Sequence, residues 1–349
     1  MDERQTRLSD LKKRRKERFV SELEIGDTVN DLFVVKKKMN PRYYRDGLWF
    51  ELLVGDRTGE IKVNFWGDEN TEDVKDLFNS FRVGDVVLIK SGKVELYDNE
   101  IQISVDGERG TIERCSPDEY YIEDFIPALD RDKRKELINQ LREEIGKIKN
   151  IPLKTLLTRF FDDMDFVERF SSIPSSVNHH HNYIGGNLEH TLNVVKICKA
   201  ISDITPDINR DLLITGAILH DIGKTEEYRC TSFIDKTDEG RLAGHIVLGD
   251  RMVKSKIEEL RREGVDFPRY LENQVSHMIL SHHGKLEWGS PEIPKLIEAI
   301  VLHHADLMDS QIKYHIQKRE EERRIRDDNW GVIWDNDMRR KKPFYIGEV

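Results

Sequence analysis

Histidines recur through the second half of the chain, several of them beside an aspartate or an apolar helical face. All 12 histidines of the 349 residues lie after residue 178. Imidazole and carboxylate groups together bind Mn, Fe, Zn, Co or Ni, and bridging carboxylates suit two-metal sites. A single buried histidine is more often a hydrogen-bonded core residue than a ligand. Recurrence on five segments instead favours helices that converge on one metal centre.

The candidate ligands lie on stretches with helical periodicity. "LEHTLNVVKICKAI" places His190 on an apolar helix face, and "RDLLITGAILHDIGK" is an apolar helix that ends in His220 and Asp221. Three further segments carry the remaining candidates: "GRLAGHIVLGDRMV" with His245, "QVSHMILSHHGK" with His277, His282 and His283, and "LIEAIVLHHADLMD" with His303, His304 and Asp306.

The stretch "NHHHNYIGGNLEH" alone holds four histidines, three of them consecutive. Adjacent side chains in a loop splay apart, so residues 179–181 do not form a self-contained metal site. The Gly185-Gly186 pair predicts a break in the chain before the next helix begins. His190, on that helix, is therefore the member of this stretch that we expect at the metal.

Two other phosphate- and metal-binding motifs are excluded. "DIGKT" resembles the end of a P-loop, but that motif requires glycine where this chain has Ile218. The sequence contains no H-E-x-x-H, so a zincin protease is not supported.

The order of these residues resembles the HD-domain superfamily of metal-dependent phosphohydrolases. His190, His220, Asp221 and Asp306 match its H…HD…D pattern, while His245 and the pair His282-His283 match the extra ligands of its two-metal members.

The wording around these residues is more specific. "HHNYIGGNLEHT", "LHDIGK" and "LSHHGKLEWGSP" look like the YhaM-type bacterial 3′–5′ exoribonucleases, which join an N-terminal OB-fold to a C-terminal HD domain. The resemblance covers residues 20–315 and implies that activity. Asn187 departs from the leucine of the family phrase "GGLLEHT", and the tail beyond residue 320 has no counterpart in the family pattern.

The resemblance also implies roles for individual residues. The first metal would be held by His190, His220, Asp221 and Asp306. Asp221 would bridge to a second metal held by His245 and His282, with His283 ligating or just behind. Lys224 would meet the scissile phosphate beside Asp221, and His180 and His181 would donate hydrogen bonds to the substrate at the pocket rim. The metals expected are two divalent ions, Mn first, with Fe, Co, Ni, Zn or Mg as alternatives.

Residues 20–110 differ in character from the helical remainder. Their order of predicted elements is strand, strand, strand, helix, strand, strand, which is typical of an OB-fold barrel with its helix between strands three and four. The predicted fold class is therefore a multidomain chain, an all-β OB-fold followed by an all-α HD domain.

One face of the predicted barrel interleaves aromatic and basic residues. Alternation along the second and third strands puts Trp49, Lys62 and Trp66 opposite the apolar positions, and Lys36 and Arg42 lie nearby. Such a face suits stacked bases and a phosphate backbone, so single-stranded RNA or DNA is the predicted partner. The alternative is that one or both tryptophans only close a barrel end.

The bulk properties are compatible with this layout. Net charge is −10, with 38% hydrophobic and 35% charged residues; this leaves room for a local basic face. The N-terminus lacks an apolar signal core, no apolar run is long enough for a membrane span, and the three cysteines form no CxxC. We therefore expect a cytoplasmic protein that binds no membrane, with a homo-oligomer left open.

Composition shifts predict five segments. They are a basic N-terminal extension (1–17) containing "KKRRK", an OB-fold (18–112), a helical connector (113–150), an HD domain (151–320) and a charged tail (321–349) with a weak basic patch, "RRKKPFY".

Two other functions remain as alternatives. One is a nucleotide or cyclic-nucleotide phosphohydrolase with a regulatory OB domain, and the other is a nucleic-acid-binding protein with a non-catalytic HD domain. The intact set of ligands argues against the second alternative.

Overall fold

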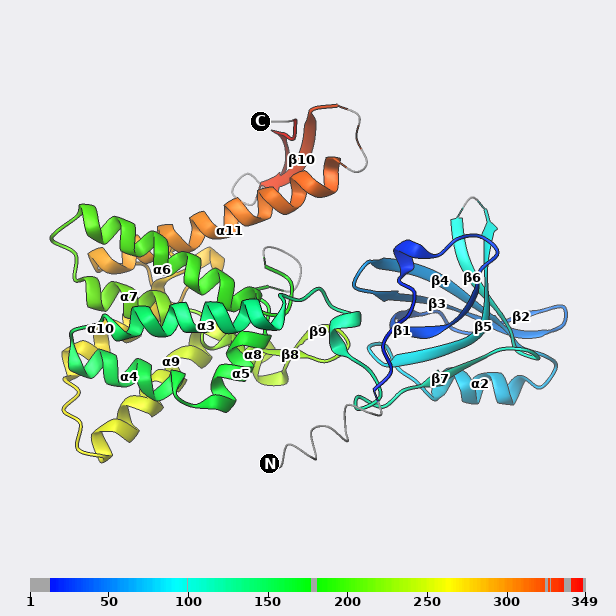
Figure 1. Cartoon of the computed structure of the whole chain (residues 1–349), viewed down its shortest axis with the longest axis horizontal. Helices are drawn as coiled ribbons and strands as arrows, with labels where there is room; N and C mark the ends of the chain where they lie inside the picture. Colours follow the sequence, from blue (N-terminus) through cyan, green and yellow to red (C-terminus); the bar gives the residue numbers. More distant parts are fainter. Residues whose placement is uncertain are drawn as a thin grey trace. The chain divides into compact units, whose positions relative to one another are not determined.

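The structure, a computed structural model, describes residues 13–98, 100–176, 181–323, 326, 328–335 and 340–347. The chain divides into two compact units, Met1–Ala128 with Cys230–Ile234, and Leu129–Arg229 with Asp235–Val349. We call them the barrel unit and the helical unit, after the elements that build them (Figure 1). The predicted fold class, an all-β barrel followed by an all-α domain, is confirmed.

Five strands close the barrel: β1 (Thr28–Lys38), β3 (Gly47–Asp56), β4 (Gly59–Trp66), β5 (Val86–Tyr97) and β6 (Glu100–Asp106). Their order is β1-β3-β4-β6-β5, and pairing of β1 with β5 closes the ring. The β4–β6 pair is parallel, and helix α2 (Thr71–Asn79) connects β4 to β5. This is the topology of an OB-fold.

Short elements decorate the barrel, and sequence patterning did not predict them because each spans only three or four residues. They are β2 (Arg42–Tyr44), which pairs with β3, β7 (Thr111–Arg114), which pairs with β5, and the 3₁₀ turns η1 (Val20–Glu22) and η2 (Ile122–Asp124).

Alternation along β3 and β4 fills the barrel interior as predicted. Phe50 lies opposite Phe65, and Leu52 lies opposite Val63. All four are buried, and the two phenylalanine rings stack 5.0 Å apart. Because the side-chain period of a strand is two, the same register turns Trp49 and Trp66 to the outside.

Lys16, the last residue of the "KKRRK" cluster, is buried rather than exposed on a tail. Its Nζ lies 2.6 Å from the carbonyl oxygen of Leu32, 3.5 Å from an oxygen of Asp56 and 3.4 Å from the ring centre of Phe33. Burial lowers the pKa of Lys16, and the charges of Asp31 and Asp56 oppose that shift. The contacts of this lysine therefore attach the N-terminal segment to the barrel.

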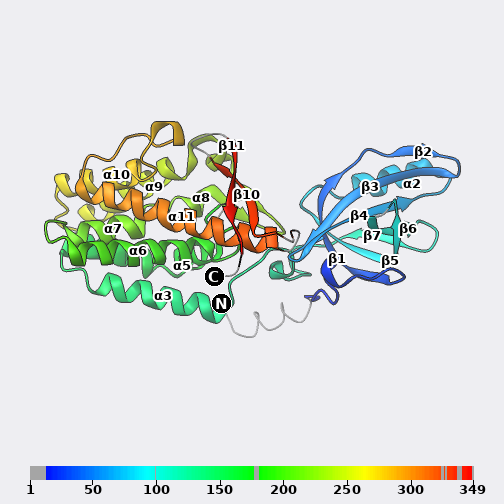
Figure 2. The ribbon, with the colours of Figure 1, turned by 90° about the horizontal axis from the view of Figure 1, so that it is seen from above.

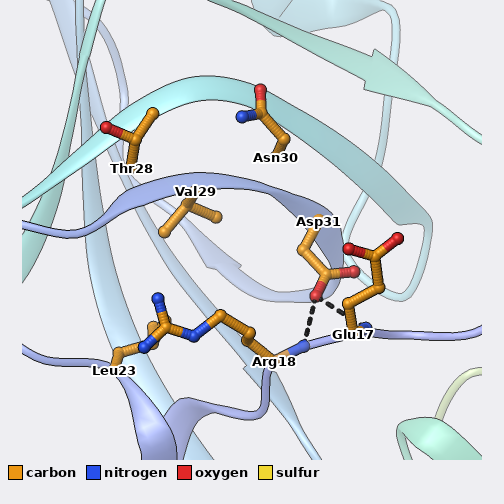
Figure 3. Close-up of a pocket in the computed structure, with 7 residues that line it drawn as sticks. All are labelled: Glu17, Arg18, Leu23, Thr28, Val29, Asn30 and Asp31. Atoms are coloured by element: carbon orange, nitrogen blue, oxygen red, sulfur yellow. Dashed lines mark hydrogen bonds between the residues drawn. The ribbon is translucent and has the colours of Figure 1, made fainter.

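Asp31 holds the next residues of that segment. Its Oδ2 accepts the backbone N–H groups of Glu17 at 2.9 Å and Arg18 at 2.8 Å, beside a small pocket that Thr28 also lines (Figure 3). Backbone donors that would otherwise lack a partner are thus satisfied by one carboxylate.

Lys16→Met should lower the free energy of unfolding by about 3 kcal/mol, because removing one member of a buried ion pair leaves the others uncompensated. Urea unfolding of the whole chain, followed by tryptophan fluorescence, measures this change. Lys90→Met is the matched control, since Lys90 pairs with Glu113 at the surface, and such exposed pairs contribute about 0–1 kcal/mol. Equal losses in the two variants would contradict the structural role of Lys16.

Helices dominate the second unit (Figure 2). They are α3 (Arg131–Gly146), α4 (Ile151–Phe161), α5 (Met164–Ser172), α6 (Gly186–Ile204), α7 (Arg210–Leu219), α8 (Lys224–Glu227), α9 (Asp238–Arg262), α10 (Arg269–Ser281) and α11 (Ile297–Arg323), with the turn η3 (Leu286–Trp288). The strand pair β8 (Tyr228–Cys230) and β9 (Ile234–Lys236) lies between α8 and α9.

One apolar core joins these helices. Leu141 and Ile145 of α3 are buried in the same cluster as Leu192 of α6, Leu213 of α7 and Met278 of α10. One face of α3 therefore belongs to the core of the helical unit. Among the described residues, no helix is long and apolar enough to cross a membrane.

The chain ends in a hairpin that sequence patterning did not predict. Strands β10 (Trp330–Asp335) and β11 (Arg340–Tyr345) pair antiparallel after α11 (Figure 1). The dense charges of this stretch indicated a solvated helix end and a tail, and they masked its alternation.

Candidate metal centre and nucleic-acid face

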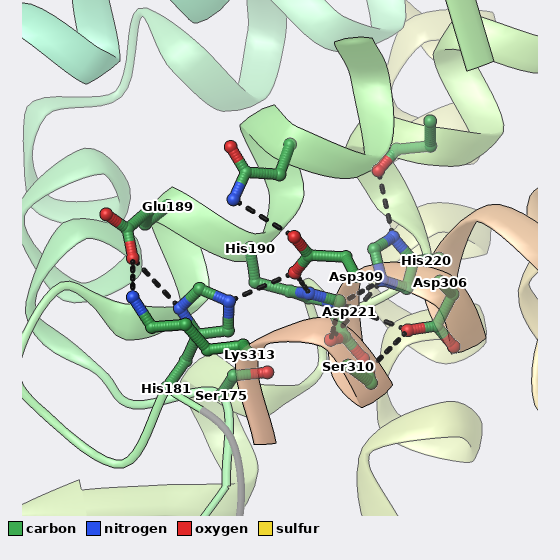
Figure 4. Close-up of polar contacts among 12 residues, drawn as sticks. Ser175, His181, Glu189, His190, His220, Asp221, Asp306, Asp309, Ser310 and Lys313 are labelled. Carbon is green, nitrogen blue, oxygen red and sulfur yellow. Dashed lines mark hydrogen bonds and ion pairs between the residues drawn. The ribbon is translucent and has the colours of Figure 1, made fainter. Parts of the chain in front are cut away.

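Five helices or their ends bring the predicted ligands together in the helical unit. His190 lies on α6, and His220 and Asp221 follow α7 (Figure 4). His245 lies on α9, His282 and His283 follow α10, and Asp306 lies on α11. All seven predicted metal ligands therefore meet at one place.

A break in α9 sets the position of His245. Gly244 has φ +72° and ψ 156° inside the helix, a backbone conformation that disfavours side chains. The helix restarts at His245, whose ring centre lies 5.7 Å from that of His282. A glycine directly before His245 thus turns this imidazole toward the other candidate ligands.

Asp221 presents its two oxygens to two different groups of imidazoles. Oδ2 lies 3.3 Å from Nε2 of His220 and 3.6 Å from Nε2 of His190. Oδ1 lies 3.5 Å from Nε2 of His245 and 3.7 Å from Nε2 of His282. Asp306 completes the first group, with Oδ1 3.1 Å from Nε2 of His190.

In each imidazole of the two groups, and in His283, Nδ1 faces an oxygen of the protein; the contact between His245 and Glu227 is an ion pair. The partners are Asp309 Oδ2 for His190 (2.7 Å), Ala217 O for His220 (2.8 Å), Glu227 Oε2 for His245 (2.9 Å), Ile279 O for His282 (2.7 Å) and Trp288 O for His283 (3.0 Å). An Nδ1–H that donates to oxygen leaves the Nε2 lone pair for a metal, the arrangement of protein metal sites.

Several atoms at the second group lack a hydrogen-bond partner within the part of the chain that the structure describes. They are Oδ1 of Asp221 and the Nε2 atoms of His245 and His282, all buried. Buried polar atoms normally have partners, and leaving them without one is costly. A divalent cation would satisfy all three at once, so these residues fit a bound metal.

Electrostatics at the first group favour a cation. Burial would raise the pKa of Asp306, but its hydrogen bond with His190 and the charge of that ring hold the pKa well below the usual value. Burial would lower the pKa of His190, yet Asp306 and Asp309 raise it to about 9. In the metal-free protein the negative charge here thus attracts a proton.

The second group differs. Burial, with the neighbouring His283 and His220, lowers the pKa of His282 well below its usual value. Burial and His245 lower the pKa of His283. Both rings are therefore neutral near pH 7, the form that binds metal.

Lys224 stands beside Asp221, at the first position of α8. Its Nζ donates to Oδ2 of Asp221 and to Oγ of Ser175, 3.2 Å away, and its side chain is buried. Burial would raise the pKa of Asp221, but the charge of Lys224 and then of His220 hold that pKa well below the usual value. Contact of Lys224 with a phosphate stays a prediction.

The structure places His181 behind His190, fully buried. Its Nε2 lies 3.0 Å from Oδ2 of Asp309, and its Nδ1 lies 2.8 Å from the hydroxyl of Tyr183 and 3.0 Å from Glu189 (Figure 4). A role at the substrate stays a prediction for this residue. His180, for which the same role was predicted, lies outside the described residues.

Two carboxylates that orient the ligands escaped the sequence analysis. Asp309 holds Nδ1 of His190, and Glu227 holds Nδ1 of His245. The spacing of Asp306 and Asp309, three residues apart on one helix face, was a usable signal for the first. Glu227 had no comparable signal, because its partner lies beyond the β8–β9 hairpin.

The other histidines of these segments lie outside the two groups. His277 accepts the backbone N–H of Lys295 at 2.9 Å, and His303 contacts the carbonyl oxygen of His282 at 2.9 Å. His304 is exposed, and Nδ1 of His315 lies 2.7 Å from the carbonyl oxygen of Gln311.

Trp49 and Trp66 form a stacked pair on the outside of the barrel. Their ring centres are 5.1 Å apart, with planes 16° from parallel. Arg42 is the cross-strand neighbour of Trp49, and the indole N–H of Trp66 donates to Ser104 at 3.1 Å. Three strands thus bring one cation and two aromatic rings into a row.

The two predicted lysines lie on different parts of the barrel. Lys62 is partly exposed and pairs with Glu100 of β6. Lys36 is partly exposed on β1, and a Cβ at Gly55 would lie 3.4 Å from its Cε. Contact of these residues with nucleic acid stays a prediction.

Family models match both units. One described as "HD domain" matches residues 187–311, one described as "OB-fold nucleic acid binding domain" matches residues 34–109, and one described as "Putative helicase" matches residues 125–206. The chain is therefore a protein with an OB-fold barrel followed by an HD domain.

Curated relatives cover most of the chain. The 3'-5' exoribonuclease YhaM of Listeria welshimeri is 30% identical over 301 residues, 85% of this chain and 89% of that protein. Its counterpart in Bacillus subtilis (strain 168) is 30% identical over 289 residues, 83% and 87% of the two chains. The chain therefore belongs to the YhaM family.

Among solved structures, a replication factor A related protein from Methanobacterium thermoautotrophicum is 29% identical. It covers 29% of this chain and 93% of its own, with a TM-score of 0.25.

Proposed function

We propose that this chain is a metal-dependent exoribonuclease that removes nucleotides from the 3′ end of single-stranded RNA. The observation that carries the proposal is the arrangement around Asp221, whose two oxygens face two separate groups of histidine Nε2 atoms. The relatives are named 3'-5' exoribonucleases, which supports the substrate and the direction.

The residues fit two divalent ions, and Mn is the metal proposed first because carboxylates suit it, with Fe, Co, Ni, Zn or Mg as alternatives. The first would be held by His190, His220, Asp221 and Asp306, and the second by Asp221, His245 and His282, with His283 at its edge. When bound, such a pair would supply a hydroxide nucleophile near neutral pH and would neutralise charge on the phosphoryl oxygens.

The protein's own groups do the positioning. Asp309 and Glu227 fix the rings of His190 and His245 through Nδ1, so that Nε2 cannot turn away. Lys224, held by Asp221 and Ser175, keeps one positive charge at the centre for a phosphate oxygen. The stacked tryptophans of the barrel unit would bind bases of the RNA molecule that is being cleaved.

Product analysis tests this function. The protein is incubated with 5′-end-labelled single-stranded RNA and Mn²⁺, and in parallel with a panel of nucleotides and cyclic nucleotides. We expect a ladder of labelled RNAs that shorten from the 3′ end. Turnover of the nucleotides alone would instead indicate a nucleotide phosphohydrolase.

The same assay with single-stranded DNA measures how strongly hydrolysis depends on the 2′-hydroxyl of the substrate. Cytoplasmic location and a homo-oligomer stay predictions.

Gly223→Ala should disturb the second group without touching a ligand. A Cβ at this position would lie 2.0 Å from the carbonyl oxygen of His245 and 2.4 Å from the backbone N of Gly249. Both are backbone atoms of α9, so the helix must shift and carry His245 away. We expect Mn²⁺ affinity and RNA hydrolysis to fall by about 10- to 100-fold, as when a group that orients a ligand is lost.

Gly146→Ala is the matched control, because a Cβ there meets no atom within 4 Å. Isothermal titration with Mn²⁺ measures the affinity of both variants. A wild-type affinity for Mn²⁺ in Gly223→Ala would show that the close approach of Gly223 to the backbone of α9 does not control the second group.

A further inference from the structure

The C-terminal hairpin, β10 and β11, packs through one of its two faces onto the end of α11. Ile333 and Ile346 are buried, with 3% and 1% exposure, and the ring of Phe344 lies 5.8 Å from that of His315 on α11. Arg323 of α11 donates to the carbonyl oxygens of Ile346 and Gly347. These contacts fix a two-stranded ribbon that would be marginal alone.

The opposite face of the ribbon is exposed and rich in aromatic residues. Strand alternation and register put three cross-strand pairs on it, and we call them the outer face: Trp330 with Tyr345, Val332 with Pro343, and Trp334 with Lys341. Trp330, Trp334 and Tyr345 are 55%, 49% and 52% exposed, and the first and last pack edge to face at 5.7 Å.

On the outer face Trp330 and Tyr345 contact each other across the ribbon, and the side chains of Trp330, Trp334 and Tyr345 remain about half exposed. The inner face makes the contacts with α11 that hold the ribbon in place. Exposed aromatic rings interleaved with a cation are instead the features of surfaces that bind single-stranded nucleic acid, since any base can stack on them. The six residues of the outer face include one cation, Lys341, and no carboxylate.

The ribbon is connected to the metal centre by a single helix. Asp306 lies on α11, which continues to Arg323 and leads into β10. At 1.5 Å per residue, these two residues are separated by about 25 Å along the helix axis. An RNA with its 3′ end at Asp306 has its remaining nucleotides available for a second contact on the same unit.

We propose that the outer face of the ribbon is a second binding surface for single-stranded RNA, on the 5′ side of the nucleotide being removed. The proposal rests on the proposed exonuclease function for its substrate, and it adds a site on the helical unit to the face on the barrel. Its role is to retain long RNA between successive cleavages.

RNA fits this surface better than a second copy of the chain does. Pairing of two outer faces would bury Lys341 of each copy, and the outer face offers no carboxylate to pair with it. A polyanion instead gains from the charge of Lys341.

The test compares Trp330→Ala/Trp334→Ala with Tyr270→Ala, which removes an aromatic side chain that is 65% exposed on α10 of the same unit. Fluorescence anisotropy with single-stranded RNA of about 20 nucleotides, without metal so that nothing is cut, gives the dissociation constant Kd. We expect Kd to rise by about 10- to 100-fold in the double variant and to stay at the wild-type value in Tyr270→Ala.

Lys341→Glu keeps all three aromatic rings and should raise Kd in the same direction, with a weaker dependence on salt. Lys341→Glu also tests the proposal if the double variant does not fold. Hydrolysis of a dinucleotide with Mn²⁺, a substrate too short to reach the ribbon, reports whether the metal centre is intact.

Unchanged Kd in both ribbon variants would overturn the proposal, whatever the enzyme hydrolyses. Unchanged Kd together with loss of a dimer in sedimentation would assign the outer face to a second copy of the chain. If the wild type binds RNA through the ribbon but does not hydrolyse it, the exonuclease function fails while the ribbon proposal stands.

Discussion

Asp221→Asn should reduce RNA hydrolysis by at least about 10³-fold, the largest effect expected of any single change. Its carboxylate is the one group that faces both sets of histidines, through Oδ2 on one side and Oδ1 on the other. An amide carries no negative charge and offers only one acceptor oxygen. Neither set of histidines would then face a charged carboxylate oxygen. Initial rates on single-stranded RNA and bound Mn²⁺ measured by mass spectrometry should fall together.

Asp203→Asn is the control for this change, because Asp203 pairs with Arg210 at the surface of the same unit. Circular dichroism distinguishes lost chemistry from lost folding. Hydrolysis within about tenfold of the wild type in a folded Asp221→Asn protein would remove Asp221 from the catalytic centre.

Trp49→Ala/Trp66→Ala should raise the KM for long single-stranded RNA by about 100-fold, since stacking contributes about 1–3 kcal/mol per base. The two rings stack on each other beside Arg42, outside the barrel core, and both side chains are partly exposed. Because the metal ligands lie in the other unit, kcat at saturating RNA should change little. Steady-state kinetics with RNA of graded length separates KM from kcat.

Tyr97→Ala removes an exposed aromatic residue of the same barrel, outside the tryptophan pair, and should leave KM unchanged. A wild-type KM in the tryptophan variant would mean that the pair only closes the barrel end. Equal increases in the KM for long RNA and in the KM for a dinucleotide would point to disturbed folding rather than to lost stacking.

The two folds were predictable because their signals are local. Alternation along β3 and β4 predicted which faces are buried, and periodicity of the later segments predicted helices with ligands at their ends. The adjacent pair His220-Asp221 and the spacing of the other ligands then matched a known family. Each helix of the second unit packs one apolar face into a shared core. This packing brings the predicted metal ligands at the helix ends close together.

What escaped prediction depends on contacts distant in sequence. The burial of Lys16 requires Asp31 and Asp56 on two different strands, and a run of basic residues normally indicates solvent. Glu227 orients His245 across an intervening hairpin. The ribbon of β10 and β11 alternates correctly, but its apolar positions are few and lie among charges.

An anomalous difference map from a crystal of the whole chain grown with Mn²⁺ tests the central claim most directly. The account predicts two peaks about 3.5–4 Å apart on either side of the Asp221 carboxylate. One should lie beside His190, His220 and Asp306, and the other beside His245 and His282. A single peak, or a peak between His181 and Asp309 instead, would contradict a two-metal centre bridged by Asp221.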